Sequence, residues 1–500
     1  MALSRSFLFG IANSIGMLIV GLAVVPFYLA YLGLEAYGLV GFFTMTQSLL
    51  LLLDLGLAPT ISREVARFSA FGKLPEFGDL LHSLATIYWL IAGLIALALF
   101  GFSSVIAEHW LQTKTLQTET LSRAIVLMGI VIACRWPAGL YRGALVGAEK
   151  LVLASIINLS MMTVASVGAV AVLAFVSPTI EAFFIWQGGV GLTYAITMRA
   201  AAWNVIGRPR PTRFSMSELK RVWRFTAGMS LIVLTGLILV QLDKVLLSKL
   251  LVLDEFGIYM LATVVVSGLY ALISPIFSTV NPRMSMLVAN GEIERLTDLY
   301  QLSTRFLCVI VFPVSLILVV FPEELVFLWT GNLELAKGVA PILMLLAIGT
   351  SLHGVMHIPY ALQLAYGLTR IPLKITLILL IVMVPMVVVL TQLYGARGGA
   401  MAWLILQIIY VLLGTYLTHR EVLKGVGRKW LLQDVGIPIV VASVVGWISH
   451  YLVQGTGYSA VIDLALAIAM SIVTALLILL ASPRLLPLVL NTIKARSLAF

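Results

Sequence analysis

The positively charged residues of this chain follow a pattern that a membrane imposes. Fourteen long apolar segments can be numbered along the sequence, and the connections between them alternate between cation-rich and cation-poor. Of the 32 Lys and Arg residues, 25 lie on one side, five lie on the other, and two lie within the fourth segment. Cytoplasmic connections of membrane proteins carry such an excess of Lys and Arg. The pattern predicts a multi-spanning membrane protein with both termini in the cytoplasm.

Composition agrees with this prediction. The chain is 61% hydrophobic and 11% charged, whereas soluble domains are about 45–50% apolar and about 25% charged. The apolar runs are continuous rather than alternating, which favours helices over a closed β-barrel. The excess of Lys and Arg in the predicted cytoplasmic connections explains the net charge of +10. We therefore expect no nucleic-acid partner. Cys134 and Cys308 lie inside apolar runs with no Cys/His cluster, so we expect neither a metal nor a cofactor.

We therefore expect an all-α polytopic membrane protein with about 14 transmembrane helices. The predicted spans are 7–31, 39–61, 81–107, 121–141, 151–176, 180–203, 224–248, 257–280, 304–328, 339–365, 371–393, 398–418, 435–453 and 460–481. Pro438 and the short turn at 454–459 would also allow the last two segments to form a re-entrant pair. The five cations on the cation-poor side are Lys114, Lys244, Lys249, Lys337 and Arg397.

A short motif occurs twice. The stretch LEAYGL at 34–39 recurs as LDEFGI at 253–258, an offset of 219 residues that also relates Arg5 to Arg224. Six spans separate the copies, so both halves enter the membrane in the same direction. This predicts two six-helix lobes related by a pseudo-two-fold axis along the membrane normal. The expected domains are a lobe at 1–203, a cytoplasmic linker at 204–223, a lobe at 224–418, and two extra helices with a cytoplasmic tail at 419–500.

The stretch 32–67 resembles the N-terminal signature of the polysaccharide flippases. It carries Leu32-Gly33, Tyr37-Gly38 and the D-x-G-L motif at 54–57, followed by Arg63 and Arg67. The second half fits too, with Gln241-Leu242-Asp243-Lys244, Phe256-Gly257-Ile258-Tyr259 and Pro282-Arg283 in corresponding places. The resemblance covers roughly 1–420. It is to the Wzx-type O-antigen and lipid-linked oligosaccharide flippases of the multidrug/oligosaccharidyl-lipid/polysaccharide exporter superfamily, which includes the lipid II flippase.

This resemblance implies a transporter in the bacterial inner membrane. Such proteins move an undecaprenyl-pyrophosphate-linked glycan, an O-antigen or related repeat unit, from the cytoplasmic to the periplasmic leaflet by alternating access. The resemblance implies a monomer driven by an H⁺ or Na⁺ gradient or by the membrane potential, working beside a polysaccharide polymerase. The extra C-terminal pair is similar to the lipid II flippase arrangement, where it forms a lipid-binding groove.

Charges inside a span are costly, so each is a functional hypothesis. Arg135, in the middle of the fourth span, is the strongest candidate, because a guanidinium can bind pyrophosphate bidentately. The alternative is an interhelical ion pair with a carboxylate such as Asp54. For Asp54 itself we weigh a charge partner or cation-coupling site against a helix-packing hydrogen bond. Asp243 and Lys244 are about 100° apart on a helix, so we expect Asp243 to face inward and Lys244 the surface.

Further candidates lie near span ends. Arg63 and Arg67, with Glu64 between them, share a cytoplasmic helix face and could capture the anionic head group, or simply anchor on anionic lipid. The same two readings apply in the second lobe to Arg283 and Arg305. Arg123 is a candidate for an outward gate and Asn13 for sugar hydroxyls, the latter against ordinary interhelical bonding. These candidates are Arg63, Glu64, Arg67, Arg123, Arg283, Arg305 and Asn13.

Two other functions remain open from the sequence. A cation-coupled multidrug antiporter would require an acidic cavity, whereas the deepest charge here is Arg135. A membrane-embedded glycan polymerase or ligase would carry a large periplasmic catalytic loop, whereas the longest such connection is about 108–120. No P-loop, nucleophile elbow or HExxH motif occurs. We therefore expect a flippase rather than an enzyme.

Overall fold

The computed structural model describes residues 2–54, 57–71, 77–207, 212–453, 460–482 and 485–487. Within these residues the regular structure is helical, apart from one isolated parallel bridge between Gln112 and Val252. Eleven of the described helices are long and apolar enough to cross a membrane. The prediction of an all-α polytopic membrane protein is confirmed. The centre of the predicted linker, most of the predicted tail and residues 55–56 of the D-x-G-L motif lie outside the described residues.

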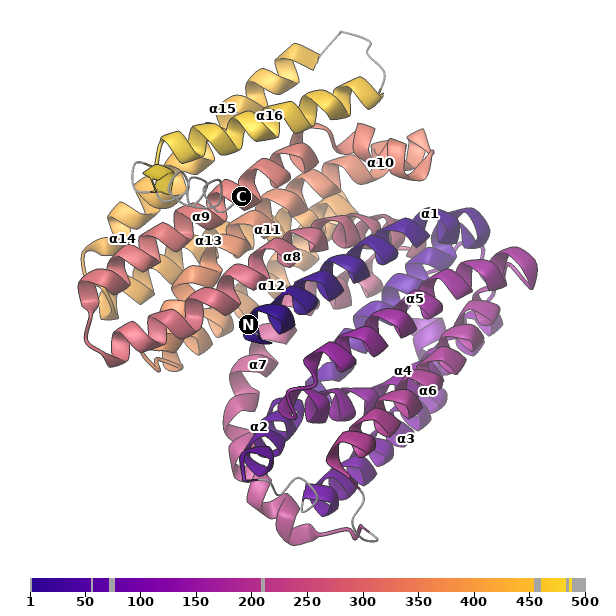
Figure 1. Cartoon of the computed structure of the whole chain (residues 1–500). Helices are drawn as coiled ribbons and strands as arrows, with labels where there is room; N and C mark the ends of the chain where they lie inside the picture. Colours follow the sequence, from indigo (N-terminus) through magenta and orange to yellow (C-terminus); the bar gives the residue numbers. More distant parts are fainter. Residues whose placement is uncertain are drawn as a thin grey trace, which may run out of the picture. The chain divides into compact units, whose positions relative to one another are not determined.

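The chain divides into two compact units, residues 1–257 and 258–500. The first unit, drawn from indigo to magenta and pink in Figure 1, contains the following helices: α1 (Ala2–Leu50), the 3₁₀ turn η1 (Leu51–Asp54), α2 (Leu57–Ala70), α3 (Gly78–His109), α4 (Thr118–Gly147), α5 (Leu151–Phe175), α6 (Ile180–Ile206) and α7 (Met216–Leu250). Helix α8 (Leu253–Ala289) begins in the first unit and continues into the second. The four domain boundaries expected from the repeat remain a prediction.

The second unit contains the helices α9 (Ile293–Val320), α10 (Pro322–Thr330), α11 (Leu333–Ala365), α12 (Arg370–Tyr394), α13 (Ala396–Glu421), α14 (Val426–Lys429), the π-helix η3 (Trp430–Gly436), α15 (Ile437–Val453) and α16 (Ala460–Leu480). Helix α11 packs on α9, α10 and α13, and α16 packs on α9 and α15. The last two predicted segments, 435–453 and 460–481, correspond to the stretches Val426–Leu452 and Ile462–Leu480, which are long and apolar enough to cross a membrane.

The first two predicted spans meet at a kink inside α1. The backbone is not helical at Gly33, whose φ of 78° and ψ of 172° are readily adopted only by glycine, so two helical segments join there. The second span is then interrupted at η1, before α2. The ninth predicted span, 304–328, was wrong at its C-terminal end. Helix α9 ends at Val320 and α10 begins at Pro322, because proline has no backbone N–H to continue the preceding helix.

Helix α4 is the centre of the first unit and packs on α2, α3 and α6. Gly143 and Gly147, four residues apart, let it approach α2 closely. A Cβ at Gly147 would lie 2.3 Å from the carbonyl oxygen of Ser62, and one at Gly143 would lie 2.8 Å from that of Ala58. Small residues at this spacing are typical of helix pairs in membranes, where packing rather than hydrophobic burial drives association.

Helix α3 shows which surface of the first unit meets lipid. Leu90, Leu94 and Leu97 are each more than 60% exposed and recur at helical spacing, whereas Tyr88 and Ala92 on the other face are buried. An exposed apolar stripe of this kind would be unfavourable in water. In a bilayer it is the expected outer face, so α3 lies at the periphery of the first unit and packs its other face on α4.

Candidate substrate-binding site

Arg135 projects from α4 toward α6 inside the first unit. Its Nη2 donates a hydrogen bond to Oε1 of Gln187, and the Gln187 amide donates in turn to the carbonyl of Ala165 on α5 at 3.2 Å. The guanidinium carbon lies 5.9 Å from the centre of the Phe43 ring. A Cβ at Gly191 would lie 2.9 Å from Cγ of Arg135, so this glycine makes room for the arginine stem.

The partner of Arg135 is neutral, and this decides what the site can bind. Within the described part of the chain Arg135 forms no ion pair, so the expected alternative of a pair with Asp54 is not what the structure contains. Gln187 orients the guanidinium but does not cancel its charge. A cation that is largely withdrawn from water without a counter-ion attracts anions strongly. The geometry therefore suits a phosphate-type ligand better than a cationic one.

Asn13 belongs to a second polar cluster in the same unit. The Tyr194 hydroxyl of α6 donates to Oδ1 of Asn158 on α5 at 3.0 Å, and the Asn158 amide lies 3.5 Å from Oδ1 of Asn13 on α1. The Asn158 amide also lies 3.1 Å from the sulfur of Met17. Interhelical bonding, one of the two readings of Asn13, therefore has a structural basis, and sugar binding by Asn13 remains a prediction.

Three residues of α6 connect the two clusters. Gln187, Gly191 and Tyr194 lie four and three residues apart, so they share one helix face. Sequence reasoning did not select Gln187 or Tyr194, because uncharged side chains in a span carry little signal on their own. The signal was their spacing: a polar, small, polar stripe at helical period in an otherwise apolar segment.

Asp54 stabilises the break in the second span. Its Oδ2 accepts the backbone N–H of Ala58 at 3.2 Å, and its Oδ1 accepts a hydrogen bond from the hydroxyl of Tyr88 on α3. A carboxylate that accepts a backbone N–H of the first turn caps the new helix and complements its dipole. Asp54 thus makes helix-terminus and interhelical bonds, and a role in ion coupling remains a prediction.

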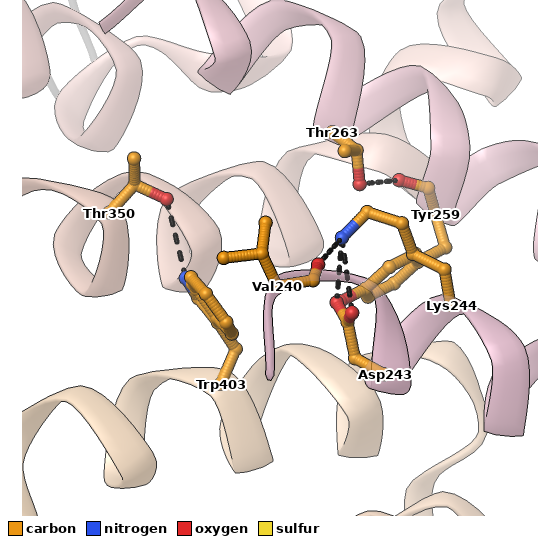
Figure 2. Close-up of polar contacts among 7 residues, drawn as sticks. All are labelled: Val240, Asp243, Lys244, Tyr259, Thr263, Thr350 and Trp403. Carbon is orange, nitrogen blue, oxygen red and sulfur yellow. Dashed lines mark hydrogen bonds and ion pairs between the residues drawn. The ribbon is translucent and has the colours of Figure 1, made fainter. Parts of the chain in front are cut away.

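Asp243 and Lys244 contact each other instead of facing apart. The Lys244 ammonium lies 3.0 Å from one carboxylate oxygen of Asp243 and donates to the carbonyl of Val240 at 2.8 Å, as Figure 2 shows. The Lys244 side chain is 12% exposed and the Asp243 side chain 2% exposed. The expectation that Lys244 extends to the surface is therefore wrong. The flexible lysine stem turns back along the helix, because a buried ammonium without its carboxylate would be costly.

The remaining first-unit candidates lie on helix ends. On α2, Arg67 pairs with Glu64 at 3.6 Å across one turn, with the arginine about half exposed and the glutamate buried. Arg63 is exposed on the same helix. On α4, Arg123 pairs with Glu119, and both side chains are more than two-thirds exposed. The α2 positions fit surface capture of a head group and lipid anchoring equally well. Both interpretations stay predictions, as does the role of Arg123 in an outward gate.

Arg305 has a buried partner that the sequence did not indicate. Its Nε donates to Oδ1 of Asp434 in the π-helix at 2.5 Å, with exposed fractions of 13% and 0%. Trp430 of the same π-helix donates to the hydroxyl of Thr304 at 2.8 Å. These bonds attach the start of the C-terminal helix pair to α9. Arg283 is exposed on α8, and a substrate contact for either arginine remains a prediction.

An apolar groove lies between α9, α11 and α15 in the second unit. Its volume is about 500 Å³. The lining is mainly aliphatic and aromatic, with a few hydroxyl groups and one histidine; it includes Phe312, Leu316, Met344, Ser443, Trp447 and His450. A cavity of this size and lining suits a hydrocarbon chain rather than a sugar.

Comparisons with known proteins agree on the class. The profile of the family described as "Polysaccharide biosynthesis protein" matches residues 31–333. The "Putative O-antigen transporter" of Shigella flexneri is 23% identical over 414 residues, which are 81% of this chain and 93% of that protein. Among solved structures, the lipid II flippase MurJ in an inward closed conformation has a TM-score of 0.69 at 14% identity, covering 94% of this chain and 98% of its own.

A second solved structure shares the fold. It is an inward-facing multidrug resistance transporter of the MATE family in the MOP superfamily, with a TM-score of 0.66 at 14% identity, covering 82% of this chain and 96% of its own. The similar proteins are transporters and flippases, not enzymes, which removes the glycan polymerase or ligase from the alternatives. The chain is a multi-pass membrane protein whose fold is shared with known flippases and transporters, and it belongs to the polysaccharide biosynthesis protein family.

Proposed function

We propose that this protein translocates a polyprenyl-pyrophosphate-linked oligosaccharide, such as an O-antigen repeat unit, from the cytoplasmic to the periplasmic leaflet of the bacterial inner membrane. Both termini face the cytoplasm in this proposal, as the cation pattern predicts. The observation that carries it is the charge of Arg135, which is held by a neutral amide in an apolar helical unit. A bound diphosphate group would neutralise the charge of Arg135, which no described carboxylate neutralises.

The polar clusters of the first unit divide the head group between them. Arg135 and Gln187 engage the diphosphate, and the Asn13–Asn158–Tyr194 cluster offers amides and a hydroxyl to the first sugar. The polyprenyl tail remains in hydrocarbon, and the groove beside α15 in the second unit is a separate candidate contact for a chain of this kind. The MurJ comparison covers 94% of this chain and the MATE comparison 82%, and this difference supports a functional role for the C-terminal helix pair.

The membrane potential favours export of such a substrate. Moving one elementary charge through 100 mV is worth about 2.3 kcal/mol, and a diphosphate diester carries two negative charges at neutral pH. Release of the anion from the negative cytoplasmic side to the periplasm is therefore downhill without any bound ion. A cation gradient would act in addition, with Asp243 and Lys244 as the candidate coupling pair.

The test is a flipping assay in proteoliposomes with a fluorescent polyprenyl-diphosphate glycan. Arg135→Ala should lower the initial rate about 10- to 150-fold, because a hydrogen bond to a charged group is worth about 1.5–3 kcal/mol. Arg135→Lys should recover part of the rate. The matched control is Arg295→Ala, which removes an arginine with 78% exposure from a surface pair with Glu292. Unchanged flipping by Arg135→Ala would refute the proposal, and efflux of cationic dyes by the parent protein would favour the multidrug antiporter.

A further inference from the structure

The two copies of the repeated motif touch each other reciprocally. Gly38 follows the kink of α1, and Gly257, its equivalent at an offset of 219, is the fifth residue of α8. A Cβ at Gly38 would lie 2.2 Å from the carbonyl oxygen of Leu253. A Cβ at Gly257 would lie 2.8 Å from that of Leu34, the equivalent of Leu253. Each glycine therefore receives the backbone of the other copy, and the two contacts are related by a local two-fold.

The acidic residues of the two copies converge on one loop. Glu35, only 7% exposed, accepts the backbone N–H groups of Lys114 at 2.6 Å and Thr115 at 3.1 Å, and the Thr115 hydroxyl. Its equivalent, Asp254, lies 3.3 Å from the ammonium of Lys114. The loop between α3 and α4 is thus held by the same residue type from both copies of the motif. The low exposure of Glu35 and its three donors fix this loop closely.

The end of α7 adds a third set of contacts to the same loop. The backbone N–H of Leu253 donates to the carbonyl of Gln112 at 2.8 Å, and the Gln112 amide donates to the carbonyl of Lys249 at 3.0 Å. The indole of Trp110 donates to the hydroxyl of Ser248 at 3.0 Å. The loop at 110–115 therefore bridges the two copies, at the end of the unit where the predicted connections are poor in cations.

A reciprocal contact between repeat copies has to lie on their pseudo-two-fold axis. In transporters built from parallel repeats the two halves rock against each other, so a contact between the copies at one end of the axis must separate when that end opens. Because the two turns touch through backbone atoms at glycines, no side chains of these glycines interlock, and the turns can separate without side-chain rearrangement at Gly38 and Gly257. The hydrogen bonds and the ion pair lie at helix ends, where water can replace them.

We propose that the two turns, 34–38 and 253–257, together with the loop 110–115, form a latch that closes the exit side of the translocation path and opens once per transport cycle. The latch rests on the proposed function for the path it closes and on the predicted orientation for its side. Glu35 and Asp254 hold the bridging loop, and Gly38 and Gly257 allow the two turns to close. A fixed pivot would make the same contacts, but transport would continue if a covalent bond held those contacts closed.

A reversible disulfide distinguishes a latch from a pivot. Gln112 and Val252 are bridge partners, so a cysteine pair at these positions has suitable geometry. The background is Cys134→Ala/Cys308→Ala. The matched control pair is Ser103→Cys/Ser122→Cys, whose hydroxyls lie 3.2 Å apart between α3 and α4 of a single repeat. Reduction of each purified protein regenerates its own unlocked reference, so a folding defect cannot pass for locking.

The latch predicts that oxidised Gln112→Cys/Val252→Cys flips the fluorescent diphosphate lipid at least tenfold more slowly than the reduced protein. Full rate should return with dithiothreitol, and the oxidised control pair should stay within twofold of its reduced form. Mass spectrometry confirms the disulfide in both. Equal rates for the oxidised and reduced latch pair would overturn the proposal, since the contact would then not need to open.

A second measurement needs no substrate and so separates the latch from the proposed function. Ala36→Cys, at a position 5% exposed, should react slowly with a membrane-impermeant maleimide added from the periplasmic side. Adding Glu35→Ala, which removes the loop's acceptor, should raise this labelling rate at least fivefold. A buried cysteine away from the latch, Ala169→Cys, should stay unlabelled with and without Glu35→Ala. If the labelling rate of Ala36→Cys is the same with and without Glu35→Ala, the latch is contradicted, whether or not the protein transports a glycan.

Discussion

Replacing Gln187 with glutamate tests whether the uncompensated charge of Arg135 carries the substrate. The change is nearly isosteric and places a carboxylate where the amide oxygen now accepts the guanidinium hydrogen bond. The site's net charge falls from +1 to zero, while the side chain at position 187 keeps nearly the same size and shape. Gln187→Leu is the matched control, because it removes the acceptor and leaves the positive charge.

The magnitude follows from the geometry. A phosphate bound on the open side of the guanidinium would lie about 6 Å from the new carboxylate. Two unit charges at that separation repel by about 3 kcal/mol at an effective dielectric constant of about 20. Flipping by Gln187→Glu should therefore fall about 100-fold or more. Gln187→Leu should lose less, about 10-fold, because a hydrogen bond to a charged group is worth about 1.5 kcal/mol at the lower end of its range.

The assay combines initial flipping rates in proteoliposomes with thermal unfolding of the detergent-solubilised protein. In Gln187→Glu the gained attraction to Arg135 is offset by the cost of burying a carboxylate. We therefore expect its unfolding midpoint to stay within about 5 °C of the parent. A stable Gln187→Glu protein that flips as fast as the parent would refute the reasoning, because an arginine already paired with a carboxylate would then suffice.

Three further predictions concern stability and the tail groove. Asp434→Asn should destabilise the protein by about 3–5 kcal/mol in thermal unfolding, because it leaves Arg305 buried without its charge partner, and Arg305→Met/Asp434→Leu should recover most of that loss. Gly398→Ala should lower the unfolding midpoint by about 2–4 °C or more, because its Cβ would lie 1.9 Å from a backbone carbonyl of α12, whereas Gly93→Ala, with nothing within 4 Å, should be neutral. Ser443→Trp should fill the groove beside α15, slowing flipping of a long polyprenyl substrate at least fivefold more than that of a farnesyl analogue; equal slowing would contradict a tail site.

Most of the fold could be predicted because a membrane restricts the options. A continuous apolar run long enough to cross hydrocarbon has to be a helix. The cation pattern also predicts the side of each connection, and that orientation stays a prediction. The errors came at places where backbone geometry changes inside a run. The break at Asp54 and the division after Val320 depend on local capping and on a proline, which hydropathy does not register.

The candidate site was only partly visible in the sequence. Arg135 was identified because a charge inside a span is rare. Its partner Gln187 was not, since a single amide has no such cost and its significance depends on which helices pack together. Lys244 and Arg305 carry charges of the same kind, yet each reaches a carboxylate, one next to it and one 129 residues away.

The sequence by itself determined the solvent of this protein, its helical class, its family and the existence of a repeated turn, because composition and spacing are properties of the chain. Only the tertiary structure decided which charges are neutralised and which are not, since this depends on side-chain distances between helices remote in sequence. It also decided that Gly38 and Gly257, alike in the sequence, meet across a local two-fold. A repeat predicts symmetry, but only packed coordinates show where its copies touch.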